Sequence, residues 1–415
     1  MALAPKTRKN IFRLVFFALV LLAVVFLIGL LELAASYYVR KESGNRVDHP
    51  RLHHTWLPKA TCTHYDWIAQ NPEYPNPYVH TYNSQGWIAD HDILEKKPAG
   101  CYRIFYVGDS FTEGCVPMDQ SVPSRVQAFL NARRAACGHF FEVINTGTTS
   151  YSPVIYYVLI RYYLLRYAPD LIVINVDMSD NYDDWRYSQN LLTDAHGNPW
   201  AVSPTRVYDR PFIQMKNGVV KNTLWVRLHI FLYEHSYLYN FIQQRLASFW
   251  PKEAGPIGDD PKLMESLHRS GIYTPWAWCQ GDRDTFTESN VRRTMDVLAR
   301  IIALCQENKV KVLLTGVPHY EQYAKGRENL PLWSARPHEE LKNLALKSGA
   351  AYLDSYAAMA PFVAGTRQSD LYYKHDMHFN PRGNALWSQC HIQALMDPKN
   401  QLLPQECYGN GSQGT

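Results

Sequence analysis

An apolar run near the start of the chain constrains this protein more than any other feature. Leu14 to Leu31 are eighteen consecutive uncharged and almost wholly apolar residues; Glu32 follows, and residues 33–38 extend the run. About 20 helical residues cross the hydrocarbon of a bilayer, whereas a cleavable signal peptide has an apolar core of roughly 7–15 residues. We therefore expect an uncleaved transmembrane anchor at 14–36, preceded by a cytoplasmic tip at 1–13.

The charge distribution orients this anchor. Four basic residues and no acidic residue precede the run, and they account for the whole net charge of +4. Basic flanks stay on the cytoplasmic side of a membrane, so residues from about 37 onward are expected to face outward. The neutral remainder of the chain offers no electrostatic reason to bind nucleic acid.

Strand and helix patterns alternate from residue 101 onward. Five strands joined by helical crossovers predict a parallel sheet that is covered on both faces. We expect this α/β domain to span 101–400, between a membrane-proximal lead-in at 37–100 and a tail at 401–415. Thr285 and Glu288 are spaced as a capping box for the second group of helices. The strands are expected at 102–107, 140–144, 171–176, 310–316 and 351–354, and the helices at 122–134, 154–166, 290–307, 338–348 and 384–396.

An insertion at 185–289 interrupts this alternation. It contains a hairpin pattern at 212–221 around Asn217-Gly218, an aromatic and partly helical stretch at 224–250, and a polar loop at 251–261. We expect a lid or substrate wall beside the site of the α/β domain. A purely structural embellishment is the alternative.

The chain has eight cysteines, all after the apolar run. Outward-facing cysteines can pair, so at least one disulfide is expected, although eight cysteines allow 105 full pairings. Their spacing matches no compact zinc pattern. They are Cys62, Cys101, Cys115, Cys137, Cys279, Cys305, Cys390 and Cys407.

The strongest chemical motif follows the first expected strand, where Gly108, Asp109 and Ser110 stand in a row. Open α/β sheets place their sites at the carboxyl ends of such strands. A serine nucleophile needs a base, and the base needs a residue that orients it. Near the other end of the chain, Asp376 stands two residues before His378 in a turn that precedes the last helix.

These blocks, in this order, resemble the GDSL-type (SGNH) hydrolases. Residues 143–152 are similar to the second block of that family, 170–184 to the third and 375–384 to the last, and the flanks at 83–87 and 97–100 are similar too. The resemblance covers roughly 80–185 and 290–396. It implies a three-layer α/β/α, flavodoxin-like fold with a five-stranded parallel sheet.

The resemblance also implies roles for named residues. Ser110 is the expected nucleophile, His378 the general base and then acid, and Asp376 its orienter. The family takes oxyanion donors from the nucleophile's own N–H, from a glycine N–H in block two and from an asparagine side chain in block three.

The chain departs from the family pattern in three places. The block-two glycine position is occupied by Ser150, with Gly147 nearby. The block-three asparagine position is occupied by Ser179, with Asn181 nearby. The last block reads Asp-x-His, a shorter form that also occurs in periplasmic polysaccharide O-acetyltransferases of this superfamily. The expected oxyanion donors are therefore Ser110, Gly147, Ser150, Ser179 and Asn181.

Two further residues are expected at the substrate. Asp109 precedes the serine, and His319 follows the fourth strand at its carboxyl end, with packing as the alternative for His319. The acidic pairs at 183–184 and 259–260 are expected to be solvated turn residues.

Together these features predict a serine-dependent acyl-ester hydrolase or acyltransferase, without cofactor or metal. Its expected partners are an acylated glycan of the cell envelope or a secreted glycan, the bacterial inner membrane, and membrane acyl-transfer machinery; its domain faces the periplasm or exterior. Two alternatives are a non-catalytic glycan-binding scaffold and a metal hydrolase built on His375, Asp376 and His378.

Overall fold

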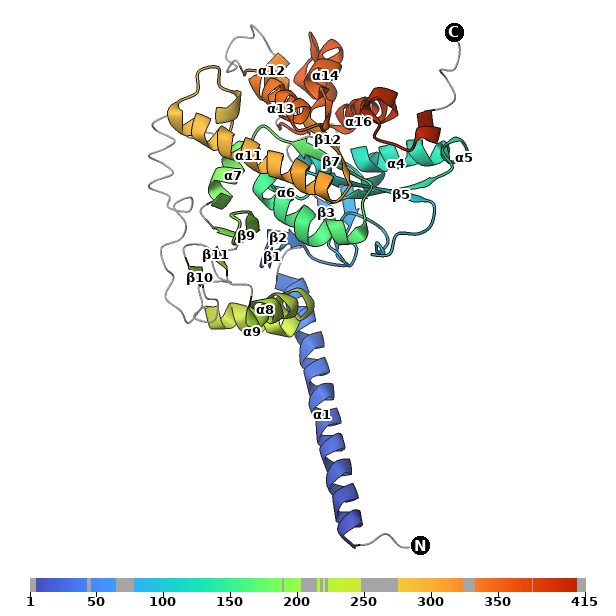
Figure 1. Ribbon diagram of the computed structural model, residues 1–415, viewed down its shortest axis with the longest axis vertical. Helices are drawn as coiled ribbons and strands as arrows, with labels where there is room; N and C mark the ends of the chain where they lie inside the picture. The colour runs from blue at the N-terminus through green and yellow to red at the C-terminus, as the bar shows by residue number, and fades with distance from the viewer. Residues whose placement is uncertain are drawn as a thin grey trace.

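A five-stranded parallel sheet forms the centre of the computed structural model (Figure 1). Its strand order is β13-β12-β7-β5-β6, so the first strand lies between the second and the third, as in flavodoxin-like folds. This confirms the predicted parallel α/β architecture. The strands are β5 (Cys101–Val107), β6 (Phe140–Asn145), β7 (Leu171–Val176), β12 (Lys311–Gly316) and β13 (Ala351–Leu353). The structure describes residues 5–42, 46–64, 78–188, 190–202, 215–216, 219–220, 223–247, 275–323, 333–374 and 376–408.

Helices cover both faces of this sheet, because successive side chains of a buried strand point to opposite sides. In β7, Ile172 and Ile174 pack into one hydrophobic cluster, whereas Leu171 and Val173 pack into the other. The first cluster is covered by α6 (Pro153–Leu159), α11 (Thr285–Glu307) and α13 (Arg336–Lys347), and the second by α4 (Val122–Ala132), α14 (Ser355–Val363) and α16 (Pro381–Met396).

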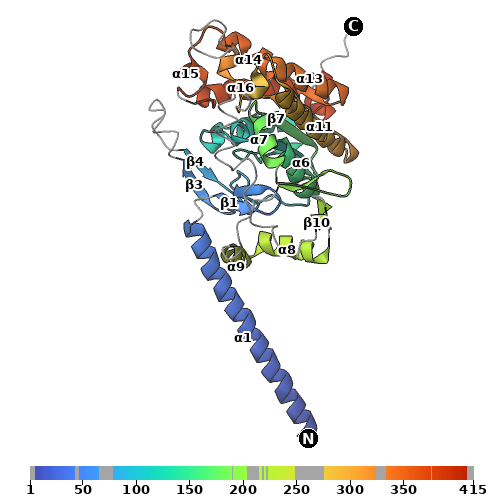
Figure 2. The same cartoon turned by 90° about the vertical axis from the view of Figure 1, so that its left-hand side faces the viewer.

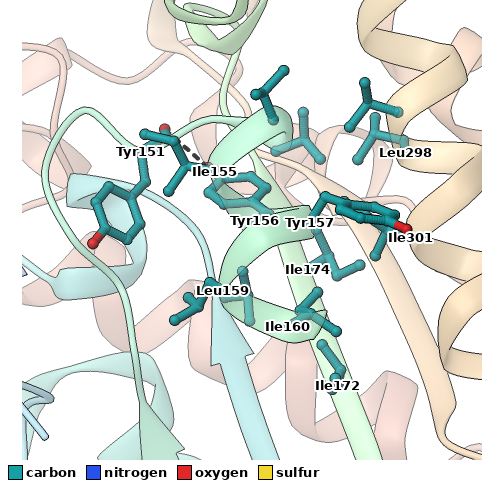
Figure 3. Packing of buried hydrophobic residues seen from close by; sticks show 14 of the residues in the cluster. Tyr151, Ile155, Tyr156, Tyr157, Leu159, Ile160, Ile172, Ile174, Leu298 and Ile301 are labelled. Atoms are coloured by element: carbon teal, nitrogen blue, oxygen red, sulfur yellow. Dashed lines mark hydrogen bonds between the residues drawn. The ribbon is translucent and has the colours of Figure 1, made fainter. Parts of the chain in front are cut away.

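Figure 3 shows the first cluster, in which α6 lies between β7 and α11. Tyr156 is fully buried there, and its hydroxyl donates to the carbonyl of Tyr151 at 3.2 Å. Leu298 and Ile301 of α11 complete the packing. Full burial of each large apolar side chain contributes about 1.5–3 kcal/mol, so this cluster holds the segment after β6 in place.

Two helices differ from the expected pattern. The helix that starts at Thr285 is capped by Asp284, whose carboxylate accepts from the amide of Thr287 at 2.7 Å. The predicted capping box of Thr285 and Glu288 is therefore wrong: Glu288 forms an ion pair with Arg336 at 2.9 Å instead. The helix expected at 154–166 begins as α6. It then continues as a π-helical turn (Ile160–Leu164) and a 3₁₀ turn (Leu165–Tyr167).

A long helix, α1 (Pro5–Glu42), extends away from the α/β domain (Figures 1 and 2). Within its stretch Lys9–Val39, a window of 18 residues has a mean hydropathy of 3.3 and no buried residue, so the helix is long and apolar enough to cross a membrane. The lead-in forms two antiparallel hairpins, β1 (Arg46–His49) with β2 (His53–Trp56) and β3 (Thr61–His64) with β4 (Tyr78–Thr81).

The insertion contributes a small sheet and two helices. The strands are β8 (Leu191–Thr193), β9 (Pro199–Val202), β10 (Met215–Lys216) and β11 (Val219–Val220), and the helices are α8 (Leu224–His235) and α9 (Tyr237–Ala247). β10 and β11 pair antiparallel where the hairpin is predicted. Asn217, Gly218 and the loop at 251–261 lie outside the described residues.

Short helices complete the described chain. They are α3 (Ser110–Glu113), α5 (Arg134–Cys137), α7 (Asp180–Ser188), α12 (Tyr320–Tyr323) and α15 (Gln368–Leu371), with 3₁₀ turns at Met118–Gln120, Ala277–Cys279, Pro398–Asn400 and Gln405–Tyr408.

All eight cysteines are described and buried, and none of them forms a disulfide, which contradicts the expectation of one. Most of them pack in separate parts of the hydrophobic core. Cys137 and Cys407 contact each other as hydrogen-bonded thiols, and burial together with Cys137 raises the pKa of Cys407 to about 12. Burial likewise raises the pKa of Cys305 to about 12, as suits an inert core thiol.

Candidate active site

Ser110 begins the short helix α3, directly after the central strand β5. Gly108 makes this turn possible: a Cβ there would lie 2.0 Å from Oγ1 of Thr112. Asp109 caps α3 by accepting from the amide of Phe111 at 2.9 Å. Ser110 is therefore held at the carboxyl end of the sheet, and its amide belongs to the first helical turn, where amides have no partner within the helix.

The structure brings Ser110, His378 and Asp376 together. Oγ of Ser110 lies 2.7 Å from Nε2 of His378. Nδ1 of His378 is hydrogen-bonded to Oδ1 of Asp376, which also accepts from the His378 amide at 2.8 Å. A carboxylate can only accept, so Nδ1 carries the proton and Nε2 is left to accept from the serine hydroxyl.

The loop that carries His378 is fixed by its neighbours. Phe111 packs against the imidazole with ring centroids 4.6 Å apart and the ring planes tilted by 31°. Asn380 caps α16 by accepting from the amides of Arg382 and Gly383, at 2.9 and 3.0 Å. Gln368 donates to the carbonyl of Asp376 at 3.0 Å. These contacts hold the imidazole in one orientation against the serine.

The block-two loop lies beside Ser110, because the pairing of β5 and β6 continues past both strands. Thr146 donates to Tyr106 at 3.0 Å, and Thr148 to Gly108 at 3.1 Å. Of the five amides from 147 to 151, four donate to partners within the protein, and the fifth belongs to Ser150. The Ser150 N–H is therefore the block-two candidate for an oxyanion donor.

Gly147 has a packing role instead. Its amide donates to the side chain of Asn145 at 3.0 Å, and a Cβ would lie 2.2 Å from the amide nitrogen of Glu113 in α3. Glycine is required there so that the loop can approach the nucleophile's helix.

Ser150 has a φ of +64°, in the left-handed region that favours glycine. The resemblance places a glycine at this position, and the backbone keeps the conformation suited to one. Tyr187 donates its hydroxyl to the Ser150 carbonyl at 2.8 Å and helps to hold this conformation.

The two block-three candidates donate elsewhere. Ser179 donates both its amide and its hydroxyl to Oδ2 of Asp177, at 2.9 and 2.5 Å. Asn181 is buried, and its amide group donates to Oγ1 of Thr294 at 3.3 Å. In this conformation the Ser179 hydroxyl proton is used by Asp177, and one of the two Nδ2 protons of Asn181 is used by Thr294.

His319 is fully buried, and its Nε2 is hydrogen-bonded to Oδ1 of Asp177 at 2.6 Å. Its ring contacts Phe111 at a centroid distance of 5.2 Å and Trp276 at 4.9 Å. The contact with Phe111 places this second His–Asp pair next to the residue that follows the nucleophile. That His319 and Asp177 form a pair was not predicted from the sequence. The signal was there, since Asp177 directly follows β7 at the carboxyl edge of the sheet.

A group of buried carboxyls surrounds this pair. Burial, reinforced by Asp177, raises the pKa of Asp109 well above its usual value, and burial also raises that of Asp180. Burial would raise the pKa of Asp177 too, but His319 and Ser179 hold it below the usual value. Burial raises the pKa of Asp183 to about 7.

The prediction that the 183–184 pair is solvated is wrong for Asp184. This residue is buried and accepts from Ser152 Oγ at 2.6 Å, the Val154 amide at 2.8 Å and Thr294 Oγ1 at 2.8 Å. It joins the start of α6 to α11, and burial raises its pKa to about 6. The pair at 259–260 and His375 lie outside the described residues.

Within the described ranges, His64, His80 and Glu113 form a group whose ligand atoms lie within 4.8 Å of one another. Nδ1 of His80 lies 3.7 Å from Oε1 of Glu113. Glu113 already accepts from the amide and hydroxyl of Thr149, at 2.9 and 2.7 Å. The group thus links α3 to the lead-in hairpin.

A cavity of about 850 Å³ lies away from the serine, between the lead-in, the end of α1 and the α8–α9 turn. Residues that line it include Tyr38, Trp87, Tyr151, Glu234 and Tyr237. Ser110, Asp376 and His378 do not line it.

Neither a family model nor a curated protein matches this chain. Similar solved structures include the acetylxylan esterase Axe2 from Geobacillus stearothermophilus, with a TM-score of 0.37 and 13% identity over 71% of this chain and 94% of that chain. An α/β hydrolase from the metagenome of Lake Arreo, Spain, has a TM-score of 0.37 and 11% identity, over 71% of this chain and 94% of that one. A two-domain esterase active on acetylated mannans has a TM-score of 0.37 and 11% identity, over 72% of this chain and 49% of that one. At these scores the likeness assigns no activity, which has to come from the site's own geometry.

Ser150→Gly tests the left-handed backbone of the block-two loop. Glycine removes a strain of about 1–2 kcal/mol but adds about 0.5–1 kcal/mol of unfolded-state entropy. We expect a free energy of unfolding that is unchanged or higher by up to about 1 kcal/mol, measured by urea denaturation in detergent. Ser152→Gly is the control: Ser152 has a φ of −147° and donates to Asp184, so its loss should destabilise. A clear destabilisation by Ser150→Gly would contradict the strain.

Asp184→Asn tests the buried carboxyl. Its pKa is raised in the folded state, so its favourable contribution is present at low pH and is lost as pH rises through about 4 to 6. Relative to the parent, the variant should gain on the order of 3 kcal/mol of unfolding free energy between pH 4 and pH 7. Asp194→Asn should show the opposite trend, because hydrogen bonds from 196 and 198 and from Arg161 hold the pKa of Asp194 below its usual value despite partial burial. Parallel pH profiles for parent and Asp184→Asn would refute the raised pKa.

Proposed function

We propose that this protein is an SGNH-type serine esterase or acyltransferase, anchored in the bacterial inner membrane by α1, with its domain in the periplasm. The observation that carries the proposal is the hydrogen-bonded series from Asp376 through His378 to Ser110. This is the arrangement that activates a serine: a base on the hydroxyl, and a carboxylate that orients the base.

In the proposed reaction, Nε2 of His378 takes the hydroxyl proton as Oγ of Ser110 attacks the ester carbonyl. The tetrahedral intermediate then expels the alcohol, which receives that proton from His378, and an acyl-enzyme remains. Water or a sugar hydroxyl attacks the acyl group, with His378 again accepting the proton and returning it to Ser110. Asp376 stabilises the imidazolium at both stages.

The oxyanion of each tetrahedral intermediate would be held by the amides of Ser110 and Ser150. Each well-placed donor is worth about 3–4 kcal/mol in the transition state. Ser179 and Asn181 serve as third donors only if their side chains leave Asp177 and Thr294, which are their present partners. Two backbone N–H donors can support the cleavage of an ester, because esters react more readily with nucleophiles than amide bonds do.

An O-acylated glycan is the proposed substrate. Trp276 and Trp333 pack against each other at a centroid distance of 4.7 Å and are partly exposed. They lie beside His319 and hence near the nucleophile's helix. Such aromatic faces pack against the apolar faces of sugar rings. An outward-facing enzyme fixed to the membrane meets envelope glycans, and membrane acyl-transfer machinery could supply its acyl groups.

Ser110→Ala is expected to lower the hydrolysis of p-nitrophenyl acetate by about 10⁴-fold or more, because the alanine removes the nucleophile. Asp376→Asn should lower the rate of hydrolysis by a factor of similar order, since it disturbs the tautomer of His378. Combining Ser110→Ala with His378→Ala should cost no more than either change alone, because the residues act as a unit. The measurement is the initial rate of hydrolysis in detergent, for the purified parent and for each single and double variant.

A fluorophosphonate probe separates an enzyme from a scaffold. It should label the parent at Ser110, as peptide mass spectrometry can show, and it should not label Ser110→Ala. Ser84→Ala, which changes a serine in the lead-in, is the matched control and should label like the parent. A parent that takes up no probe, or activity that survives Ser110→Ala, would overturn the proposed mechanism.

A further inference from the structure

Helix α8 is apolar on two faces. On its inner face, Val226, Ile230 and Tyr233 are buried against the small sheet of the insertion. On its outer face, Leu224 and Trp225 are 75% and 73% exposed, and Phe231 is 56% exposed. A helix that is apolar all round is normally buried in protein or in lipid, and an exposed patch of this kind marks an interaction site.

Glu32 fixes the position of this helix relative to α1. Its carboxylate accepts from the Ser236 hydroxyl at 2.8 Å and from the amides of Tyr237 and Leu238 at 2.5 and 3.1 Å. It thereby caps the N-terminus of α9 from a neighbouring helix, where a negative charge is favourable. The charged residue that interrupts the apolar run is thus used to attach the turn between α8 and α9.

A second contact holds α9 against α1. Tyr38 packs edge-on against Phe241 at a centroid distance of 5.3 Å and accepts a hydrogen bond from Arg245 at 2.6 Å. Ile242 and Leu246 are 43% and 40% exposed on the same hairpin. Figures 1 and 2 both show α8 and α9 lying across the upper end of α1, between the domain and the part of α1 that extends away.

We propose that the outer face of α8 lies in the interfacial layer of the bilayer that α1 enters. The eighteen residues before Glu32 span about 27 Å, close to the ~30 Å of hydrocarbon, so Glu32 marks the outer boundary of the membrane. The hairpin bound to Glu32 must lie at that level. Trp225 and the exposed Arg227 suit the interface, where aromatic rings and arginines contact headgroups.

The occupant of this face is therefore lipid. The inference rests on the membrane anchoring proposed for α1. Its consequence is that the domain is held at a fixed tilt above the membrane, and does not swing freely on a single helix.

Photocrosslinking in nanodiscs of phosphatidylcholine and phosphatidylglycerol tests this. Benzoylphenylalanine replaces one residue of the full-length chain at a time, and lipid adducts are counted by mass spectrometry. Adducts at Trp225 should exceed those at Phe362 at least about tenfold, because Phe362 is also an exposed aromatic, at 55%, but belongs to α14. Equal yields at the two positions would overturn the docking, and crosslinks from Trp225 to a second copy would make the face a protein interface.

Leu21, which is 64% exposed in α1, separates this proposal from the anchor itself. Lipid adducts at Leu21 without adducts at Trp225 would leave the anchor intact and refute the docking. No adducts at Leu21 would refute both. Glu32→Ala should reduce the adducts at Trp225 and leave those at Leu21 unchanged, whereas Glu32→Gln, which keeps an acceptor oxygen, should retain most of them. Unchanged yields at Trp225 in Glu32→Ala would show that Glu32 does not position the hairpin.

Discussion

The hydrogen bond between Ser110 and His378 joins parts of the chain that are 268 residues apart, and the candidate site depends on it. The sheet makes it possible. β5 lies between β6 and β7, so the chain reverses its direction of winding at the strand that carries Ser110. Open α/β sheets leave a crevice at such a switch point. The loop before α16 brings His378 to that crevice, and the contacts of Phe111, Gln368 and Asn380 hold it there.

The central sheet was predictable because its strands are short apolar runs separated by amphipathic helices. β7 shows why: all six of its residues are buried, as a strand covered on both faces requires, and the predicted bounds agree with the observed ones. The series formed by Ser110, His378 and Asp376 was also within reach, since each residue follows a strand or precedes a helix in a recognisable motif. Helix ends were harder to predict, because several residues near Thr285 can serve as caps and packing selects Asp284.

The partners of individual polar side chains could not be predicted. Ser179 and Asn181 stand in the expected block, but their donors are used by Asp177 and Thr294, one of which comes from a helix 113 residues further along the chain. The same holds for Asp184, which looks like a solvated turn residue in the sequence and is buried by α6 and α11. Asn181 and Asp184 both bond to Thr294, a distant partner that no local pattern encodes, whereas Ser179 bonds to Asp177 two residues before it.

The buried carboxyls bear on how the site could hold an oxyanion. Asp109 precedes the nucleophile, and a full negative charge there would oppose the charge that develops on the substrate. Its hydrogen bond from Phe111 favours the charged form, but burial and the nearby Asp177 outweigh it and raise its pKa, which favours the neutral form. Burial would raise the pKa of Asp177, but its interactions with His319 and Ser179 hold it below the usual value, which favours the charged form. The two carboxyls therefore favour different forms: Asp109 the neutral one and Asp177 the charged one. A neutral Asp109 does not oppose the negative charge that develops on the carbonyl oxygen of an ester when Oγ of Ser110 attacks it.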